Sequence, residues 1–234
     1  MYCRYSLRTT DVVAAREFYA KAIGLVLPDG AAEGRALEAW PLHERALAQG
    51  APAHWLGQLA VDDADATVNR IVGLGGQALG PIVQTKDGAR FATMRDPFGA
   101  VIGVRAGGSS VNDSPVVWHQ LHTRDADGAW AMYQQLFGWA QKQTLDVPKL
   151  DGGLRLFAWN EAGSVVGAVG NTALWPGVHT HWLFCLPVAN IDEAEASVRV
   201  HGGKPMEPIT LPDGTRIVAC DDPQGAAFGL AQRA

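Results

Sequence analysis

The sequence predicts an α+β protein made of two tandem copies of one small unit, and three observations support this fold class. A dense internal repeat runs through the 234 residues. Each copy alternates capped amphipathic helices with short strand-like runs. Apolar residues make up 47% of the chain and charged residues only 18%, below the roughly 25% usual in soluble domains. So low a charged fraction indicates extensive burial.

The repeat sets the predicted domain boundaries. The triplet His54-Trp55-Leu56 recurs 127 residues later as His181-Trp182-Leu183, and Asp96-Pro97-Phe98-Gly99 recurs as Asp222-Pro223-Gln224-Gly225. The front halves match at an offset of 114 residues in four pairs: Thr9 and Thr123, Asp11 and Asp125, Tyr19 and Tyr133, Gly24 and Gly138. We therefore place copy one at 1–106, a Gly/Ser-rich linker at 107–114, and copy two at 115–234.

Each copy contains two predicted helices. Asp11 is a predicted N-cap, after which one apolar stripe leads to Gly24. Asp63 caps the second helix of copy one in the same way. In copy two, a stripe through Ala129, Met132, Tyr133 and Leu136 predicts the third helix, and Asn190 with Glu193 resembles a capping box that opens the fourth.

Short strand-like runs flank the predicted helices. They are Tyr5–Arg8, Leu56–Val61, Arg90–Arg95, Val101–Arg105 and their counterparts in copy two. The Asp-Pro-x-Gly tetrads suit type I turns that join the last two strands. Each quarter of the chain is therefore predicted as strand, helix, then two or three strands. Segment 41–50 (PLHERALAQG) is the exception, because its pattern is helical where a fourth strand is expected.

Composition excludes several classes of function. The net charge of −5, without a run of Lys or Arg, argues against a nucleic-acid partner. No apolar stretch approaches the ~20 residues that span a bilayer, and the first residues lack the apolar core of a signal peptide. Cys3, Cys185 and Cys220 show no paired spacing, which fits reduced thiols. We expect a cytoplasmic protein, monomeric or homodimeric, whose partner is a small organic molecule rather than nucleic acid or membrane.

These motifs, all in duplicate, resemble the vicinal oxygen chelate superfamily, which includes glyoxalase I, bleomycin-resistance proteins and extradiol dioxygenases. The resemblance implies that two βαβββ modules pair into a cupped, open-barrel sheet with helices on its outer face. This chain would then form two such cups. The resemblance also implies a divalent metal, held by His or Glu/Gln on the inner faces of the strands and acting as a Lewis acid.

The metal-ligand positions that the resemblance implies carry other residues here. They are Arg4 and Trp118 on the first strands, Leu56 and Leu183 on the second-module strands, and Gly103 and Gly229 on the last strands. The remaining glutamate would fall on the fourth strand of the first module, where copy one has the helical segment 41–50. Arg, Trp, Leu and Gly do not supply the oxygen or imidazole ligands that such an ion needs. We therefore expect no metal and no other cofactor.

Because side chains alternate across a strand, the same positions identify the residues that face the cavity. The predicted ligand-binding residues are Arg4, Ser6, Arg8, His54, Gln58 and Gly103 in copy one, and Trp118, Gln120, His122, His181 and Gly229 in copy two. Arg4 and Arg8 could clamp a carboxylate or a phosphate. Gly103 and Gly229 remove bulk and could make room for a ligand ring.

Several of these residues have structural alternatives that the sequence leaves open. His54 and His181 precede a Trp at a strand entry and could simply hydrogen-bond the loop backbone. Arg4 and Arg8 could pair with Asp11 or Glu38, Trp118 could fill the cup as core, and Cys185 could be a buried hydrophobe.

The leading functional hypothesis is a protein that binds a small, partly apolar or aromatic organic molecule in a metal-free cavity. It would sequester that molecule, as bleomycin-resistance proteins do, or use a cavity histidine in acid–base chemistry; the sequence does not decide whether it is an enzyme. The alternative is a metal-dependent lyase, isomerase or ring-cleavage dioxygenase with a displaced site at His122, His179 and His181. A third possibility is a scaffold whose cups are filled by Trp118, Leu56 and Leu183.

Overall fold

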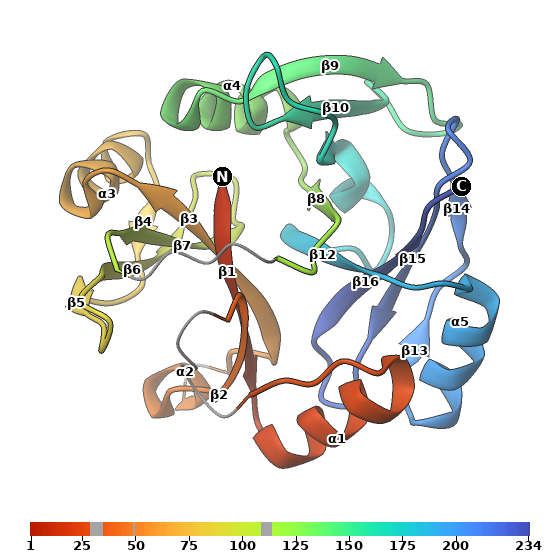
Figure 1. Cartoon of the computed structure of the whole chain (residues 1–234). Coiled ribbons are helices and arrows are strands. Elements are labelled where there is room, and N and C mark those ends of the chain that lie inside the picture. Colours follow the sequence, from red (N-terminus) through yellow and green to blue (C-terminus); the bar gives the residue numbers. More distant parts are fainter. Residues whose placement is uncertain (29–34, 49, 109–113) are drawn as a thin grey trace. The chain divides into compact units, whose positions relative to one another are not determined.

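A computed structural model describes residues 1–28, 35–48, 50–108 and 114–234 (Figure 1). Most of the predicted linker 107–114 lies outside the described residues. The strands form two mixed sheets, one from each half of the chain, accompanied by few helices. The predicted α+β class is confirmed. None of the helices among these residues is long and apolar enough to cross a membrane.

The chain divides into two compact units, and each unit combines parts of both sequence copies. Unit 1 contains Met1–Cys3, Gly57–Ser110 and His119–Trp182, and unit 2 contains Arg4–Leu56, Val111–Trp118 and Leu183–Ala234. The second half of copy one thus packs with the first half of copy two in unit 1, and the remaining halves pack together in unit 2. The domain boundaries drawn from the repeat stay a prediction.

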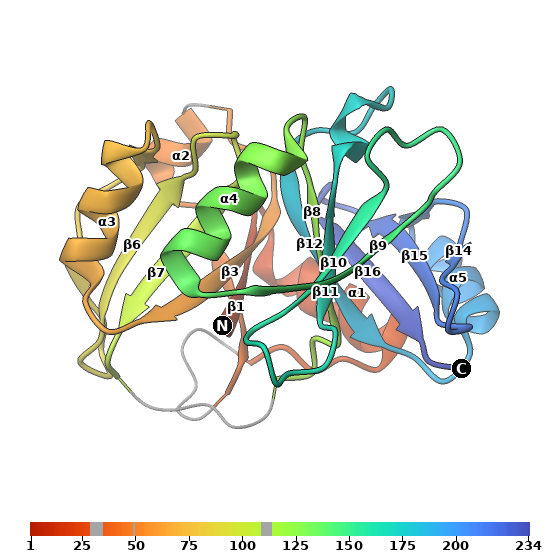
Figure 2. The ribbon, with the colours of Figure 1, turned by 90° about the horizontal axis from the view of Figure 1, so that it is seen from above.

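Unit 1 holds two groups of paired strands, two of which begin with residues of unit 2 (54–56 and 118). Strand β3 (His54–Val61) runs parallel to β7 (Val101–Ala106). Strand β7 pairs antiparallel with β6 (Arg90–Arg95). The two-residue strands β4 (Gln77–Ala78) and β5 (Val83–Gln84) also pair with β6. Strand β8 (Trp118–His122) runs parallel to β11 (Gly167–Gly170), followed by antiparallel β10 (Leu154–Ala158) and β9 (Ala140–Leu145). Helix α3 (Ala64–Gly73) packs on β6 and β7 (Figure 2), and unit 1 also holds α4 (Ala126–Phe137) and the 3-10 helix η1 (Asn171–Leu174).

Unit 2 is built in the same way, and two of its strands begin with residues of unit 1 (2–3 and 181–182). Strand β1 (Tyr2–Thr9) runs parallel to β2 (Leu37–Pro41), and β12 (His181–Pro187) runs parallel to β16 (Ala227–Gln232). Strand β15 (Arg216–Asp221) pairs antiparallel with β16, β13 (Lys204–Pro205) and β14 (Ile209–Thr210). The helices are α1 (Val12–Ile23), α2 (Glu44–Ala48) and α5 (Ile191–Val200), and α1 packs against α5.

The helix caps confirm the local predictions. The side chains of Asp11, Asp63 and Asp125 each accept a hydrogen bond from the backbone N–H three residues later. Asn190 accepts from two backbone N–H groups, those of residues 192 and 193. Gly24 ends α1 at φ 69°, a left-handed conformation that glycine adopts without steric cost.

One prediction about copy one is wrong. Segment 41–50 does contain a helix, α2, but that helix does not replace the fourth strand. The fourth strand is β2, which pairs in parallel with β1 just as β11 pairs with β8 in copy two. Its sequence, LEAWP, is five residues long, includes a glutamate and ends in proline, so neither length nor alternation marks it as a strand.

Buried polar side chains join the two copies inside each unit. In unit 1, the Tyr133 hydroxyl donates to Asp96 at 2.8 Å and accepts from Trp182 Nε1 at 2.9 Å. In unit 2, the Tyr19 hydroxyl donates to Asp222 at 3.3 Å and accepts from Trp55 Nε1 at 2.8 Å. We call these the Tyr–Trp–Asp networks. In each, one copy supplies the Tyr and the Trp, and the other copy supplies the Asp of its Asp-Pro-x-Gly turn.

The network aspartates also hold the turns in which they lie. Asp96 accepts hydrogen bonds from the backbone N–H groups of residues 98 and 100, and Asp222 from those of 224 and 226. Burial raises the pKa of both carboxyls, while these hydrogen bonds act in the opposite direction. The predicted strand–turn–strand function of the tetrads is confirmed, and the same carboxylates serve as acceptors between copies.

Candidate functional site

The predicted site residues fall in both units. Unit 2 holds Arg4, Ser6, Arg8, His54, Trp118 and Gly229, and unit 1 holds Gln58, Gly103, Gln120, His122 and His181. Within each unit, one group of these side chains comes together around polar contacts.

In unit 2, the polar group is a row of side chains on β1 and β2. Ser6 lies opposite Glu38 in the parallel pair, and the Ser6 hydroxyl donates to Glu38 Oε1 at 2.5 Å. Arg4 Nη1 donates to the carbonyl of Arg35 at 3.0 Å. Arg4, Ser6 and Glu38 are 4%, 0% and 7% exposed. Charged and polar side chains gathered in a buried row on one strand face are typical of functional sites, so this row is a candidate site.

Arg8 extends this row at the end of β1. Its guanidinium carbon lies 5.8 Å from the ring centroid of Trp40 on β2, a cation–π distance. Burial lowers the pKa of Arg8, and the carboxylate of Glu38 raises it. This electrostatic effect of Glu38 agrees with the open alternative in which Arg8 pairs with that carboxylate, which stays a prediction. We define the polar row as Arg4, Ser6, Arg8 and Glu38.

His54 lies at the start of β3. Its Nδ1 is 2.8 Å from the carbonyl oxygen of Pro52, so Nδ1 carries the proton and Nε2 keeps its lone pair. Burial lowers the pKa of His54, the Pro52 hydrogen bond opposes this, and the positive charge of Arg8 lowers it further. The backbone hydrogen bond expected for His54 is confirmed, and it fixes the tautomer.

The two glycines of the predicted site do not leave empty space. A Cβ on Gly103 would lie 2.8 Å from the ring of Phe91 and 3.0 Å from Gln58 Cγ. A Cβ on Gly229 would overlap the Sγ of Cys185, its partner in the β12–β16 register. The glycines therefore allow close approach of neighbouring side chains, which fill the room that was expected for a ligand ring.

Three other predicted residues lie in tightly packed surroundings. Gln58 is 2% exposed, and its Oε1 is 3.4 Å from Nη1 of Arg105, which is ion-paired with Asp87. Trp118 is buried on β8, and Gln120 lies opposite Ala168 on β11. Burial of this kind agrees with a packing role for Trp118.

In unit 1, three imidazoles form a second candidate group. The ring centroids of His122 and His181 are 4.8 Å apart with 21° between the planes, and those of His181 and His179 are 4.5 Å apart with 27°. We call His122, His181 and His179 the histidine stack. His122 and His181 are half-buried, whereas His179 is exposed. The sequence grouped these three histidines as an alternative, displaced metal site, and their rings do lie together.

Hydrogen bonds fix the orientation of the two inner rings. His122 Nδ1 lies 2.6 Å from the hydroxyl oxygen of Thr172, and His181 Nδ1 lies 2.9 Å from the carbonyl oxygen of His179. Burial lowers the pKa of His122 to about 3, with a further lowering from the two other imidazoles. Burial lowers that of His181 to about 4. The inner rings are therefore neutral near pH 7.

The donor set does not fit the divalent metal that the fold family implies. In the histidine stack the rings are nearly parallel, so their lone pairs point along separate planes and do not converge on one ion. In the polar row the cationic guanidiniums of Arg4 and Arg8 accompany the one carboxylate. Among the described residues, no group of three or more His, Cys, Asp or Glu side chains could hold a metal ion.

Two residues of these groups were not predicted as site residues. Glu38 was considered only as an ion-pair partner, yet it stands on the fourth strand, where the resemblance implies a glutamate. The parallel pairing of β2 with β1 would have revealed it, but the short segment LEAWP gave no strand signal. Thr172 is contributed by η1, and nothing in its sequence context marks it.

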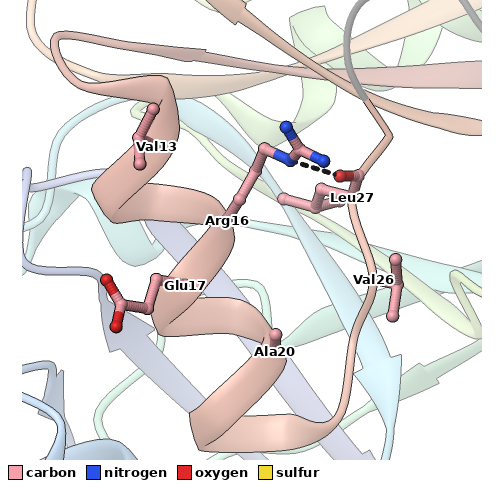
Figure 3. Close-up of a pocket in the computed structure, with 6 residues that line it drawn as sticks. All are labelled: Val13, Arg16, Glu17, Ala20, Val26 and Leu27. Carbon is pink, nitrogen blue, oxygen red and sulfur yellow. Dashed lines mark hydrogen bonds between the residues drawn. The ribbon is translucent and has the colours of Figure 1, made fainter.

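A surface pocket lies elsewhere in unit 2, between α1 and the segment after it (Figure 3). Six residues line it: Val13, Arg16, Glu17, Ala20, Val26 and Leu27. Arg16 Nε on α1 donates a hydrogen bond of 2.7 Å to the carbonyl of Leu27 on the following segment and so joins the two sides of the pocket. None of the predicted site residues lines this pocket.

Comparison with known sequences supports the predicted resemblance. Residues 4–104 match the family model described as a glyoxalase-like domain. A Mycobacterium tuberculosis protein named as a glyoxylase, CFP32, is 29% identical over 97% of this chain and 93% of its own length. The anthracycline biosynthesis protein DnrV of Streptomyces peucetius is 28% identical over 78% of this chain and 67% of its own.

Solved structures support the same fold. The Mn(II)-bound glyoxalase from Novosphingobium aromaticivorans aligns with a TM-score of 0.62 at 15% identity, over 99% of this chain and 80% of that one. Homoprotocatechuate 2,3-dioxygenase from Arthrobacter globiformis aligns with a TM-score of 0.68 at 14% identity, over 100% and 80%. The match to residues 4–104 supports the resemblance to glyoxalase-like proteins, and the glyoxalase and extradiol dioxygenase structures share the fold of this chain.

Proposed function

We propose that this chain binds a small, partly aromatic organic acid at the polar row of copy one, without a divalent metal. The observation that carries this proposal is the row on β1 and β2 in which buried Arg4, Ser6 and Glu38 lie with half-buried Arg8. Two guanidiniums and one carboxylate give the row a net positive charge. Guanidiniums favour an anionic ligand such as a carboxylate.

The row contains groups suited to both parts of such a ligand. Arginine presents a planar fork of N–H donors that matches a carboxylate or phosphate. Trp40, already placed near Arg8, adds an aromatic surface. The neutral His54 offers Nε2 as a hydrogen-bond acceptor, because its Nδ1 is bonded to the Pro52 carbonyl. A few polar groups set among apolar side chains are typical of small-molecule sites.

Substitution of Arg8 gives the most direct test of the proposal. Arg4 holds the Arg35 carbonyl and is almost fully buried, so its loss would also disturb packing. Arg8 is only half-buried. Titration of the full chain with 2-naphthoate, followed by calorimetry, should show binding that Arg8→Gln weakens about tenfold or more. Arg8→Lys, which keeps the charge and loses the fork, should lie between the two.

Arg90→Gln is the matched control, because Arg90 is an exposed arginine paired with Asp65. Its affinity for 2-naphthoate should equal that of the wild type. Equal weakening by Arg8→Gln and Arg90→Gln would reduce the effect to net charge and overturn the site. Absence of 2-naphthoate binding to the wild type would overturn the proposal that the ligand is an aromatic acid.

The metal-free part of the proposal has its own test. Elemental analysis after exposure to Zn²⁺, Ni²⁺, Mn²⁺ and Fe²⁺, followed by desalting, should show far less than one metal per chain. One tightly held equivalent would contradict this part and favour a metal-dependent lyase, isomerase or dioxygenase.

A further inference from the structure

We propose that an aromatic cluster in unit 1 relays an oxidising equivalent from the protein surface to Tyr133, where Asp96 takes up the proton. The relay consists of Trp159, Trp139 and Tyr133, and all of these residues belong to unit 1. It accepts one-electron oxidants from solution, such as peroxyl or carbonate radicals. The inference does not depend on the polar row or on its ligand.

The three relay rings touch in sequence. The ring centroids of Trp159 and Trp139 are 5.1 Å apart with 66° between the planes. Trp139 stacks on Tyr133 at 4.9 Å and 11°. Both distances lie in the range of roughly 4.5–7 Å that is usual for interacting aromatic rings. Because electron transfer slows steeply with the separation of donor and acceptor, rings in contact exchange electrons far more readily than rings separated by aliphatic side chains.

Exposure gives the relay its direction. Trp159 is half-buried, so an oxidant in solution can reach its indole, whereas Trp139 and Tyr133 are 1% and 0% exposed. In the part of the chain that the structure describes, the buried Nε1 of Trp139 has no hydrogen-bond partner. An oxidised Trp139 therefore keeps its N–H proton and remains a radical cation. A radical cation is the stronger oxidant, and it removes an electron from the stacked ring of Tyr133.

Tyr133 has a proton acceptor beside it. Its hydroxyl donates to Asp96 Oδ2 at 2.8 Å, within the hydrogen-bond reach that proton transfer requires. Burial raises the pKa of Asp96, which makes this carboxylate a better proton acceptor than one in water. The hydroxyl also accepts a hydrogen bond from Trp182 Nε1, which holds the phenol oxygen in place. A phenol that is oxidised next to a base loses its proton and becomes a neutral radical.

Electrons and protons balance over the steps of the relay. The oxidant takes one electron from the Trp159 indole and is itself reduced by one electron. Trp139 returns an electron to Trp159, and Tyr133 returns one to Trp139, so both indoles are restored. Tyr133 loses one electron and passes its hydroxyl proton to Asp96. The products are the reduced oxidant, a neutral Tyr133 radical and a protonated Asp96.

The equivalent network in unit 2 lacks this route. Among the described residues, the rings that contact Tyr19 are those of Phe18, Trp55 and Phe228, and all three side chains are buried. A phenylalanine ring is much harder to oxidise than an indole. Tyr19 therefore has a carboxylate acceptor, Asp222, without an exposed indole to pass an oxidising equivalent to it.

Flash oxidation of the full chain tests the relay. A light pulse converts tris(bipyridine)ruthenium(II), with hexaammineruthenium(III) as electron acceptor, to its ruthenium(III) form, which removes one electron from an exposed indole. Transient absorption and electron paramagnetic resonance then distinguish tryptophan from tyrosine radicals. In the wild type, a tryptophan radical should form first and a tyrosine radical should replace it. Trp139→Phe, which keeps an aromatic ring in the core, should prolong the tryptophan radical and remove most of the tyrosine radical.

Control variants identify the route and its end. Trp130→Phe makes the same substitution at a buried tryptophan of unit 1 outside the relay, and it should leave the yield of tyrosine radical unchanged. Tyr2→Phe and Tyr19→Phe should also keep that radical, whereas Tyr133→Phe should abolish it. A thermal unfolding curve for each variant shows whether the fold is kept.

Other outcomes would overturn the proposal. If Trp139→Phe and Trp130→Phe give equal yields of tyrosine radical, Trp139 is not part of the route. Loss of the radical in Tyr2→Phe assigns it to Tyr2 instead of Tyr133. Absence of any tyrosine radical in the wild type contradicts the end point, and equal rates of its formation in water and heavy water contradict proton transfer to Asp96. Because Trp139→Phe leaves the Tyr133 hydroxyl in place, the test remains decisive even if Tyr133→Phe does not fold.

Discussion

The two copies differ most on the strand faces that were predicted to bind ligand and least at the residues that join them. At equivalent first-strand positions, copy one has Arg4, Ser6 and Arg8, and copy two has Trp118, Gln120 and His122. These first-strand positions therefore carry positive charge in copy one and are neutral in copy two. In contrast, the Tyr, Trp and Asp of the two networks are identical in type and form the same hydrogen bonds. The residues that join the copies are therefore alike, whereas the strand faces that were predicted to bind ligand are not.

The networks themselves are not equally tight, and this gives the largest expected effect. The Tyr133–Asp96 bond is 2.8 Å long, whereas the Tyr19–Asp222 bond is 3.3 Å. Removing either hydroxyl leaves the buried indole N–H and one carboxylate oxygen without that partner, although the other carboxylate oxygen keeps its backbone hydrogen bonds. We expect Tyr133→Phe to lower the free energy of unfolding by about 2–3 kcal/mol, and Tyr19→Phe by less, about 1–2 kcal/mol. Urea denaturation measures both, and the reverse order would contradict the ranking.

The pH dependence of stability should distinguish the histidine faces of the two copies. The pKa values of His122 and His181, about 3 and about 4, lie below the unfolded value of roughly 6.5. The unfolded chain therefore binds protons that the folded chain does not. This contribution to stability is present above pH 6.5 and is lost as the pH falls toward 4.

A substitution in the histidine stack should reduce this loss of stability at low pH. Since His122 is only half-buried, we expect His122→Gln to remove about 1–2 kcal/mol of the decrease in unfolding free energy between pH 7.5 and 5. His43→Gln, at an exposed position, should leave the pH profile unchanged. Denaturant titrations at several pH values provide the measurement, and identical profiles for the two variants would refute the assignment.

The smallest effect is expected at a surface feature that both copies share. Arg90 forms two hydrogen bonds with Asp65, both 2.7 Å, and Arg216 forms two with Asp192, both 2.8 Å. Three of the four side chains are about half or more exposed and that of Arg216 is 32% exposed, so water and salt screen the pairs. Arg90→Ala and Arg216→Ala should each shift the melting temperature by less than about 2 °C. A large shift for only one would reveal a difference between copies that the matched geometry hides.

Local signals accounted for the parts of the fold that depend on neighbouring residues. Asp11, Asp63 and Asn190 act as caps because a side-chain oxygen reaches N–H groups two or three residues away, and such spacing is visible in sequence. Strand β2 was missed because a five-residue strand with Glu38 in its middle owes its place to pairing with β1 rather than to its own pattern.

The candidate sites were predictable to a similar extent. Alternation along β1 correctly grouped Arg4, Ser6 and Arg8, and the His-x-His spacing brought His179 and His181 together. Glu38 and Thr172 reach these groups from other elements, through pairing and a 3-10 turn that sequence spacing does not express. The filled space beside Gly229 depends on the register of β12 with β16, which fixes Cys185 opposite it.

The positions of the network residues along the chain determine the order in which the two Tyr–Trp–Asp networks can form during synthesis. Tyr133 and Asp96 are 37 residues apart, whereas Tyr19 and Asp222 are 203 residues apart. As the chain leaves the ribosome, the network of unit 1 can close as soon as Trp182 has emerged. Tyr19, among the first residues made, must wait for a carboxylate near the end of translation. Helix α1, which carries Tyr19 and is the first helix to be synthesised, is therefore among the last to gain its buried partner, Asp222.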